Sequence, residues 1–495
     1  EILRSGGRTL IERCWGRYVA LLDLGAQGAR VLRDPGGALP CHLLRHEGVD
    51  IVFSWLEDVL TTFPQLPHPR VDWDALSAHL AFGELVGRET ALQGITQILP
   101  GEAVTLGSTE TRGALLWNPA EQARGPTDVD PEEAGRSLRN TVRACVQAWA
   151  SCHDSVLLRL SGGVDSSIVL SCLAHGQTRT RITCVNYHST GANSDEREYA
   201  RAAARQARRD LVERSRDPDI RLENVLDVAR TPTPPPYVGR LSSHIDAELA
   251  RTVGATALFT GGGGDQLFFE LHEWWPAADY LRLRGWDRGL ARAVLDASRL
   301  GRVSAWRALR LAIADRLRTR TPPLDICSHW TLVTDLVRAQ ARRGGHLGHP
   351  CMAAASELPI GKLMQVQQLL YPAGYYDPGG RDDTPELVNP LLSQPIVEQC
   401  LALPTYVLAL GGVGRGLVRR AFATDLAPET ANRRSKGGLG EHLRLVLQRN
   451  LDLVRELLLD GELVGRGLLD RSALEAVLAG SMRSEERRIG KESRS

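Results

Sequence analysis

The chain has 495 residues, of which 43% are apolar and 24% charged, and its formal net charge is +1 at neutral pH. This length exceeds the usual size of one hydrophobic core, so we expect two domains. The near-neutral charge gives no global basic field, so we expect no nucleic-acid partner. Because we find neither a secretory signal nor an apolar run of bilayer length, we also expect no membrane association and a cytoplasmic location.

The nine cysteines are scattered along the chain without C-x-x-C or His-Cys ligand spacing. This pattern argues against structural zinc, a redox pair or a disulfide framework. We therefore expect most of them to be small core residues.

The first 125 residues are typical of a small strand-rich domain. Three segments of alternating apolar residues, WGRYVALLDL, ARVLRDPGGALPCHLL and VDIVFSWLEDVL, are separated by glycine and proline turns and predict antiparallel strands. An amphipathic helix is expected over 71–85. The polar, proline-containing stretch 120–132 predicts a domain boundary, which gives domains over 1–125 and 131–495.

The second domain begins with an expected helix over 131–150, followed by alternating strands and helices. Strands are predicted over 155–160, 181–187 and 256–260, and helices over 164–175, from about residue 195, and over 243–253. This order implies a parallel sheet with right-handed crossovers, whose ligands bind at the carboxyl ends of the strands. From Leu271 onward the pattern is mostly helical.

The turn after the first of these strands, Ser161-Gly162-Gly163, has the chemistry of a phosphate site. Two glycines permit backbone conformations that turn successive N–H groups toward one point at a helix N-terminus. The hydroxyls of Ser161, Ser166 and Ser167 add donors. Asp165 would repel a bare phosphate, so it implies Mg²⁺ between them. No lysine follows as in a Walker A loop, which disfavours γ-phosphate transfer by that machinery.

A second glycine run, Gly261 to Gly264, follows the strand that ends at Thr260, and Asp265 comes directly after it. These glycines would let the backbone approach a phosphate. Asp265 would then supply a second carboxylate for Mg²⁺.

The segment SGGVDSS resembles the pyrophosphate-binding loop of the N-type ATP pyrophosphatases, which include class B asparagine synthetases, GMP synthetases, β-lactam synthetases and lasso peptide cyclases. RDPGGALPCHLL is similar to a segment of the amidotransferase domain of class B asparagine synthetases. The resemblance implies an α/β fold: a parallel-sheet ATP-pyrophosphatase domain with a helical C-terminal part, preceded by a degenerate Ntn amidotransferase-like domain. It also implies that ATP is cut between its α and β phosphates.

The same resemblance implies residue roles. Leu160 would flank the nucleotide, and Val185 would contact adenine through its backbone, although both are equally typical of core residues. Thr260 and Gly261 would join the nucleotide-binding residues, and Asp165 and Asp265 would be the metal ligands. Lys436 occupies the family's lysine position, where it would offset negative charge on the phosphates and the developing oxyanion.

The resemblance also implies a proton acceptor for the amine. Glu386 corresponds to a glutamate just before a family motif and is the first choice, with His244, Glu270 and His272 as weaker rivals.

Two departures from the family pattern concern the chemistry. No cysteine stands at residue 1, where the glutaminase domain uses an N-terminal cysteine, so we expect that this domain has lost that role and is also truncated at its N-terminus. Gly262 falls where asparagine synthetases carry glutamate and β-lactam synthetases carry tyrosine. Both departures count against an asparagine synthetase.

The segments WGRYVALL, LSGGVDSS, CVNYHS, ARTPTPPPY and FTGGGGDQLFFE are most similar to those of lasso peptide cyclases. The resemblance implies that ATP and Mg²⁺ serve to adenylate an Asp or Glu side chain of a leader-free precursor peptide. Attack by the α-amine of that peptide would then form a macrolactam. A leader peptidase and a leader-recognition protein would be partners. A β-lactam or asparagine-type amide ligase for a small amino acid, and a non-catalytic scaffold, remain alternatives.

Overall fold

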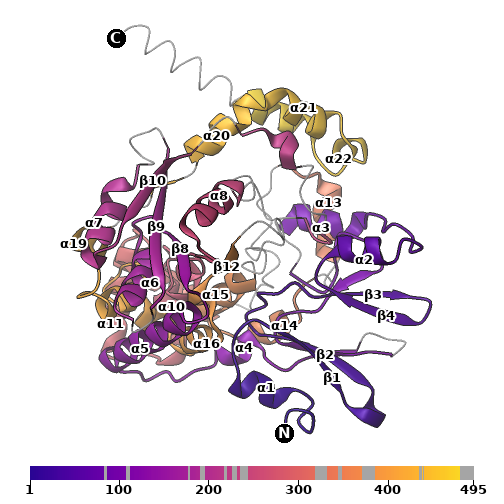
Figure 1. Cartoon of the computed structure of the whole chain (residues 1–495). Helices are drawn as coiled ribbons and strands as arrows, with labels where there is room; N and C mark the ends of the chain where they lie inside the picture. The colour runs from indigo at the N-terminus through magenta and orange to yellow at the C-terminus, as the bar shows by residue number, and fades with distance from the viewer. Residues whose placement is uncertain are drawn as a thin grey trace.

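The computed structural model describes residues 1–82, 86–107, 112–176, 179–189, 195–216, 220–225, 231–234, 243–317, 332–343, 348–370, 385–433, 437–438 and 440–479. Figure 1 shows a strand-rich N-terminal part beside a sheet that is surrounded by helices. No helix in the described ranges is long and apolar enough to cross a membrane.

The N-terminal part contains two antiparallel sheets, in agreement with the strands expected there. The first has the order β1-β2-β6-β7 and the second β4-β3-β5. The strands are β1 (Val19–Asp23), β2 (Ala29–Arg33), β3 (His42–His46), β4 (Val49–Phe53), β5 (Ile95–Gln97), β6 (Glu102–Thr105) and β7 (Arg112–Leu115). Short helices accompany them: α1 (Arg8–Arg13), α2 (Leu56–Thr62), α3 (Trp73–Phe82) and α4 (Pro119–Gln122).

One expectation for this part is wrong. The third apolar segment is a strand only as far as Phe53, and its second half forms helix α2. Leu56 and Val59 are buried and three residues apart, which is helical spacing, and Glu57 and Asp58 in the first turn complement the helix dipole. The expected helix over 71–85 forms as α3, and residues 83–85 lie outside the described residues.

The turn after β2 is held by two buried charged side chains. The Arg33 guanidinium donates to the carbonyl oxygens of Ile98 at 2.7 Å and Gly37 at 2.6 Å, while the Asp34 carboxylate accepts from the Gly37 N–H at 2.9 Å. Asp34 has no exposed surface. Burial raises the pKa of Asp34 to about 6, against the opposing effects of Arg33 and of the backbone N–H groups.

This shift predicts a pH-dependent contribution to stability. The pKa of Asp34 is higher in the folded state than in the unfolded state. Its stabilising contribution to the free energy of unfolding is therefore present below about pH 4 and is lost as the pH rises through about 6. In Asp34→Asn this dependence should disappear. The difference in free energy of unfolding between the two proteins should therefore change by about 3 kcal/mol over that range, measured by urea denaturation. A difference that is constant with pH would contradict the assignment.

The second domain is built on the expected parallel sheet. Its five strands are β8 (Ser155–Arg159), β9 (Arg181–His188), β10 (Leu211–Ser215), β11 (Ala257–Phe259) and β12 (Glu386–Val388), in the order β10-β9-β8-β11-β12. Every neighbouring pair is parallel. The chain moves outward from β8 through β9 to β10 and then returns to place β11 on the other side of β8. The strand order therefore reverses between β8 and β11, which is where open α/β sheets bind their ligands.

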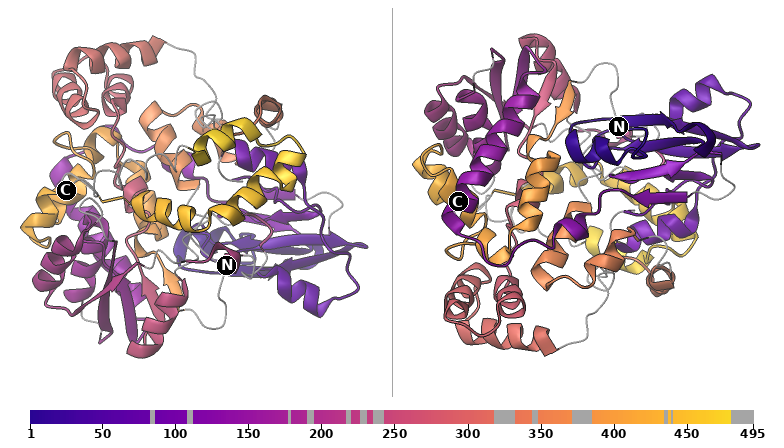
Figure 2. Two further views of the ribbon diagram at one scale, coloured as in Figure 1. Left: turned by 90° about the horizontal axis from the view of Figure 1, so that it is seen from above. Right: turned by 90° about the horizontal axis from the view of Figure 1, so that it is seen from below.

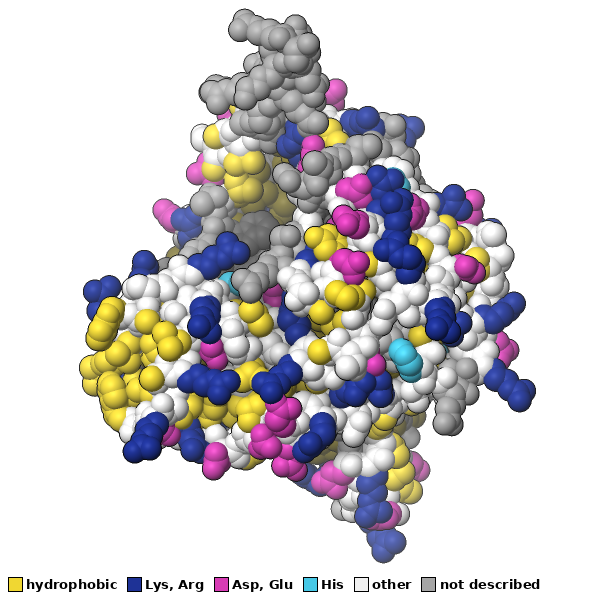
Figure 3. Space-filling view, turned by 90° about the vertical axis from the view of Figure 1, so that its left-hand side faces the viewer, with side chains coloured by type: hydrophobic (Ala, Val, Ile, Leu, Met, Phe, Trp, Pro, Cys, Tyr) yellow, Lys and Arg dark blue, Asp and Glu magenta, His cyan; other side chains and the backbone are white. Residues whose placement is uncertain are grey.

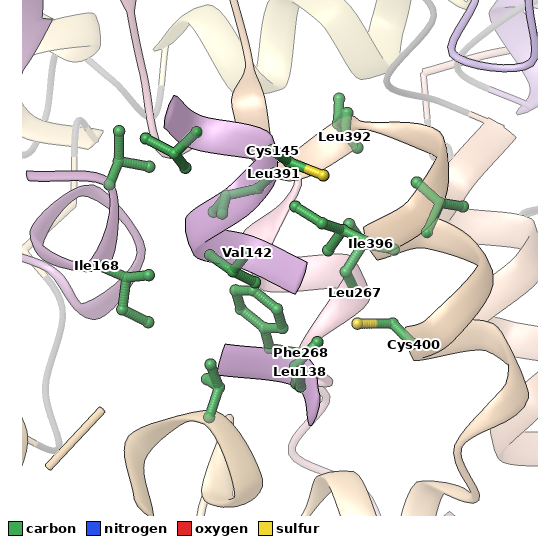
Figure 4. Packing of buried hydrophobic residues seen from close by; sticks show 14 of the residues in the cluster. Leu138, Val142, Cys145, Ile168, Leu267, Phe268, Leu391, Leu392, Ile396 and Cys400 are labelled. Atoms are coloured by element: carbon green, nitrogen blue, oxygen red, sulfur yellow. The ribbon is translucent and has the colours of Figure 1, made fainter. Parts of the chain in front are cut away.

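Helices flank this sheet. They include α5 (Pro131–Ala150), α6 (Val164–Ala174), α7 (Arg197–Ala207), α8 (Ser243–Val253) and α9 (Gly264–Leu267). Helix α5 begins with Asp130, whose side chain accepts from the Glu132 N–H, and with Pro131 in the first turn. One face of α5 enters the main core: Figure 4 shows its Leu138, Val142 and Cys145 packed with residues from the C-terminal part, among them Leu391 and Cys400.

The C-terminal part is helical, as expected. Its helices are α10 (Trp275–Leu283), α11 (Gly289–Leu300), α12 (Ala305–Leu317), α13 (Asp335–Arg343), α14 (Cys351–Ala355), α15 (Ile360–Leu370), α16 (Gln394–Ala402), α17 (Thr405–Leu408), α18 (Gly416–Ala421), α19 (Pro428–Asn432), α20 (Gly440–Arg449), α21 (Leu451–Leu459) and α22 (Glu462–Gly465). Helices α10, α11 and α12 form a separate bundle, which Figure 2 shows projecting from the rest.

The two parts of the chain contact each other at several places. Trp117 Nε1 donates to Glu398 at 2.8 Å, Gln394 Nε2 donates to the Ile11 carbonyl at 2.9 Å, and Trp15 lies edge-on to Trp149. A second apolar cluster joins α3 and α13 to residues 447–478 through side chains such as Val454 and Leu469. Helices α20 to α22 therefore extend from the sheet side back to the N-terminal part (Figure 1).

Candidate nucleotide-binding site

The loop after β8 turns sharply before α6. Gly162 has φ +74°, and a Cβ there would lie 2.5 Å from the Ala200 backbone nitrogen, so the loop requires glycine. The Ser161 hydroxyl accepts from the Gly163 N–H at 3.2 Å and lies 3.1 Å from the Ser166 hydroxyl. The N-terminus of α6 is thus surrounded by hydroxyl and N–H groups, as a phosphate requires.

The glycine run after β11 packs directly against this helix N-terminus. A Cβ on Gly261 would lie 2.6 Å from the Ser166 nitrogen and 2.9 Å from the Asp165 carbonyl carbon. Only glycine therefore lets the two loops approach this closely. Thr260 supports the second loop, because its hydroxyl accepts from the Gly262 N–H at 2.9 Å and contacts the Asn389 side chain.

Asp165 and Asp265 converge, as the sequence predicted, but they converge on an arginine. The Arg415 guanidinium donates to both oxygens of Asp165, at 2.8 and 2.9 Å, and to Asp265. A third carboxylate, Glu270, lies 2.5 Å from its Nη1. Arg415 is only 5% exposed at its side chain and has φ +59°, a left-handed conformation that non-glycine residues rarely adopt.

Three carboxylates, those of Asp165, Asp265 and Glu270, face the Arg415 guanidinium. Burial opposes the positive charge of Arg415, but the attraction of Asp165, Asp265 and Glu270 outweighs it and raises the pKa of the guanidinium. Arg415 therefore stays charged and holds the three carboxylates together.

These loops surround a cleft of about 420 Å³ at the carboxyl ends of the strands. Most of the predicted nucleotide and metal residues line it: Leu160, Ser161, Gly163, Asp165, Ser166, Val185, Thr260, Gly261 and Asp265. Gly162 and Ser167 do not, because Gly162 packs against α7 and Ser167 is buried within α6. Lys436 lies outside the described residues, so the structure does not place it.

Glu386, the first choice for the proton acceptor, is not brought into this cleft. It begins β12, whose carboxyl end is the one that faces the site. Its carboxylate pairs with Arg17 at 3.0 Å, lies 3.9 Å from His153 Nε2 and lines a separate small cavity at the contact with the N-terminal part. Of its rivals, Glu270 lines the cleft, and His272 lies 3.6 Å from Glu270. The side chain of His244 is outside the described residues.

The acidic residues of the cleft fit a magnesium ion that is bound mainly by phosphates. In the described ranges, no group of three or more His, Cys, Asp or Glu side chains is arranged to hold a metal alone. Mg²⁺ at nucleotide sites usually takes one or two carboxylates together with phosphate oxygens and water. Asp165 and Asp265, on either side of the point where the strand order reverses, are the pair that would hold it.

Sequence reasoning missed four arginines that line the cleft besides Arg415: Arg159, Arg216, Arg419 and Arg433. For Arg415 a signal was present in the Gly414-Arg415-Gly416 sequence, because flanking glycines mark a backbone that other groups approach closely. In the structure, a Cβ on Gly414 would meet the Glu270 carboxylate. On the face shown in Figure 3, basic and acidic side chains are interspersed, in keeping with the net charge.

The chain belongs to the asparagine synthase family, whose model matches residues 137–493. A search of curated protein sequences gives no match. The matched region contains the parallel sheet, both glycine loops and Arg415. Membership supports an ATP-dependent amide ligase activity, and enzymes of this family typically use ATP with Mg²⁺.

Proposed function

We propose that the protein is an ATP-dependent macrolactam synthetase that acts on a precursor peptide, as the sequence resemblance to lasso peptide cyclases implies. The observation that carries the ATP part is the meeting of two glycine loops and two aspartates at the sheet's switch point, within the family match. The peptide part is supported by the sequence segments and by Gly262, which lacks the side chain of asparagine synthetases.

In the proposed reaction, a side-chain carboxylate oxygen of the peptide attacks the α-phosphorus of ATP and pyrophosphate leaves. Ser161, Ser166 and the N–H groups at the start of α6 hold the leaving pyrophosphate. Mg²⁺ held by Asp165 and Asp265 would neutralise phosphate charge. The peptide's α-amine then attacks the acyl carbon, AMP leaves, and the amine gives up a proton.

The cleft suggests Glu270 rather than Glu386 as the group that accepts or directs this proton, because Glu270 lines the cleft and Glu386 does not. Lys436 remains the proposed partner of the phosphates and the oxyanion. Holding the two reacting ends of one peptide together would supply proximity worth at most about 7–11 kcal/mol.

The proposed partners are the two proteins that the resemblance to lasso peptide cyclases implies. A leader peptidase would expose the α-amine of the precursor peptide, and a leader-recognition protein would deliver the peptide.

A second candidate is an amide ligase for a small amino-acid substrate, of the β-lactam or asparagine synthetase type. The observation that supports it is the family match, which indicates an amide ligase without specifying a peptide substrate.

The test is mass spectrometry of the products formed from MgATP and a leader-free peptide with an early Asp or Glu. We expect AMP, pyrophosphate and a peptide lighter by one water, and no product when that acid is replaced by its amide. ADP and phosphate would overturn the proposal. AMP formed only with a small amino acid would establish the second candidate instead.

A further inference from the structure

The side of the cleft next to β10 is built around one buried carboxylate. Asp246 on α8 is 1% exposed and pairs with the Arg159 guanidinium. It also accepts from the Tyr187 hydroxyl at 2.7 Å. Burial, followed by the charge of Asp246, raises the pKa of Tyr187, so the phenol keeps its proton and the hydrogen bond. These contacts fix the Tyr187 ring and give Arg159 a carboxylate partner.

Arg216 lies over this fixed ring at the end of β10, the edge strand of the sheet (Figure 1). Its backbone N–H donates to the His188 carbonyl at 2.7 Å, and its guanidinium carbon is 5.6 Å from the centre of the Tyr187 ring. No carboxylate in the described part of the chain lies within ion-pair distance of it. Burial, and then the charge of Arg159, lower the pKa of Arg216, and these effects outweigh the attraction of Tyr187, Asp246 and Glu196.

The other arginines of the cleft are all engaged. Arg415 holds three carboxylates, Arg433 pairs with Glu196, and Arg419 donates to the carbonyl oxygens of Gly414 and Ala431. Within the part of the chain that the structure describes, Arg216 is the cleft arginine whose guanidinium makes neither an ion pair nor a hydrogen bond, so its planar fork of donors is open to a ligand. Such a fork matches the two oxygens of a carboxylate.

We propose that Arg216 is a specificity-determining residue. It would bind a carboxylate of the peptide substrate other than the carboxylate that is activated by ATP. The inference deepens the proposed function and rests on it. The phosphates have their own cradle after β8, two strands away from β10, or roughly 10 Å at the usual strand spacing. A partly buried guanidinium gains more interaction energy from a carboxylate than from the face of an aromatic ring. We therefore favour a carboxylate over a second aromatic group as the ligand of Arg216.

The test compares the wild-type protein with Arg216→Gln in steady-state kinetics with MgATP and the leader-free peptide. The KM for the peptide should rise about 10- to 100-fold while the KM for ATP stays unchanged, since a hydrogen bond to a charged group is lost. Arg216→Lys keeps the positive charge but lacks the planar fork of donors, so its KM for the peptide should lie between those of wild type and Arg216→Gln. Arg214→Gln, an exposed arginine of β10 outside the cleft, is the matched control and should behave as wild type.

A second peptide, in which every carboxylate except the reacting one is an amide, separates the possible causes. With this peptide, wild type and Arg216→Gln should have the same KM. An equal penalty with both peptides, an unchanged peptide KM, or a rise in the KM for ATP would overturn the inference. Failure of the proposed function is distinguishable, because it would show as no AMP and no macrolactam from the wild-type protein.

Discussion

Replacing Asp165 by asparagine should reduce formation of AMP and pyrophosphate to background, a loss of at least about 1,000-fold. The substitution keeps the shape of the side chain but removes the charge that would hold Mg²⁺ at the start of α6. Arg415 keeps Asp265 and Glu270 as partners, so the free energy of unfolding should fall by less than about 3 kcal/mol. Release of labelled pyrophosphate measures the first effect, and urea denaturation the second.

The control for this variant is Asp128→Asn. Asp128 also pairs with an arginine, Arg284 at 2.9 Å, but it is 88% exposed and remote from the cleft. Its loss should leave the rate unchanged. Substantial pyrophosphate release by Asp165→Asn, with the fold intact, would remove Asp165 from the mechanism. Lys436→Ala is expected to abolish adenylation in the same assay.

The second large effect is expected for Arg415→Gln. This change removes the buried cation that Asp165, Asp265 and Glu270 share, which should lower the free energy of unfolding by about 3–5 kcal/mol. Activity should fall along with it, because the two aspartates lose the group that brings them together. Thermal and urea unfolding measure the loss of stability.

Combining this change with Glu270→Gln identifies its cause. Removing one of the repelling carboxylates should restore part of the stability lost in Arg415→Gln. The loss of unfolding free energy in the double variant should therefore be smaller than the sum of the losses in the two single variants. If the two effects simply add, the charge cluster does not account for the destabilisation. Arg419→Gln is a less suitable control because this arginine also lines the cleft. Arg420→Gln, which removes an exposed arginine of α18, is the matched control and should change the free energy of unfolding little.

Local sequence determined the elements of the second domain and the sharp glycine turns of its loops. The change from buried strand to Gly162-Gly163 to helix was readable because glycine tolerance and helical spacing are local properties, and the predicted bounds of β8, α6 and β9 differ from the structure by one residue at most. The convergence of Asp165 and Asp265 also followed, since the carboxyl ends of parallel strands meet at one edge. The helical half of the segment that ends in α2 was missed, because strand and helix periods are hard to separate over so few residues.

Only the tertiary structure decided which charged groups share the cleft. Arg415 is 250 residues from Asp165 in the sequence, and Arg159 and Asp246 come from different elements, so no local pattern pairs them. The position of Glu386 was decided in the same way. Its neighbours resemble a family motif, but the register of β12 against β11 places it at the amino end of the strand, beside Arg17. Side-chain chemistry can be read from sequence, whereas the meeting of distant charges depends on strand order and register, which form only when the chain packs.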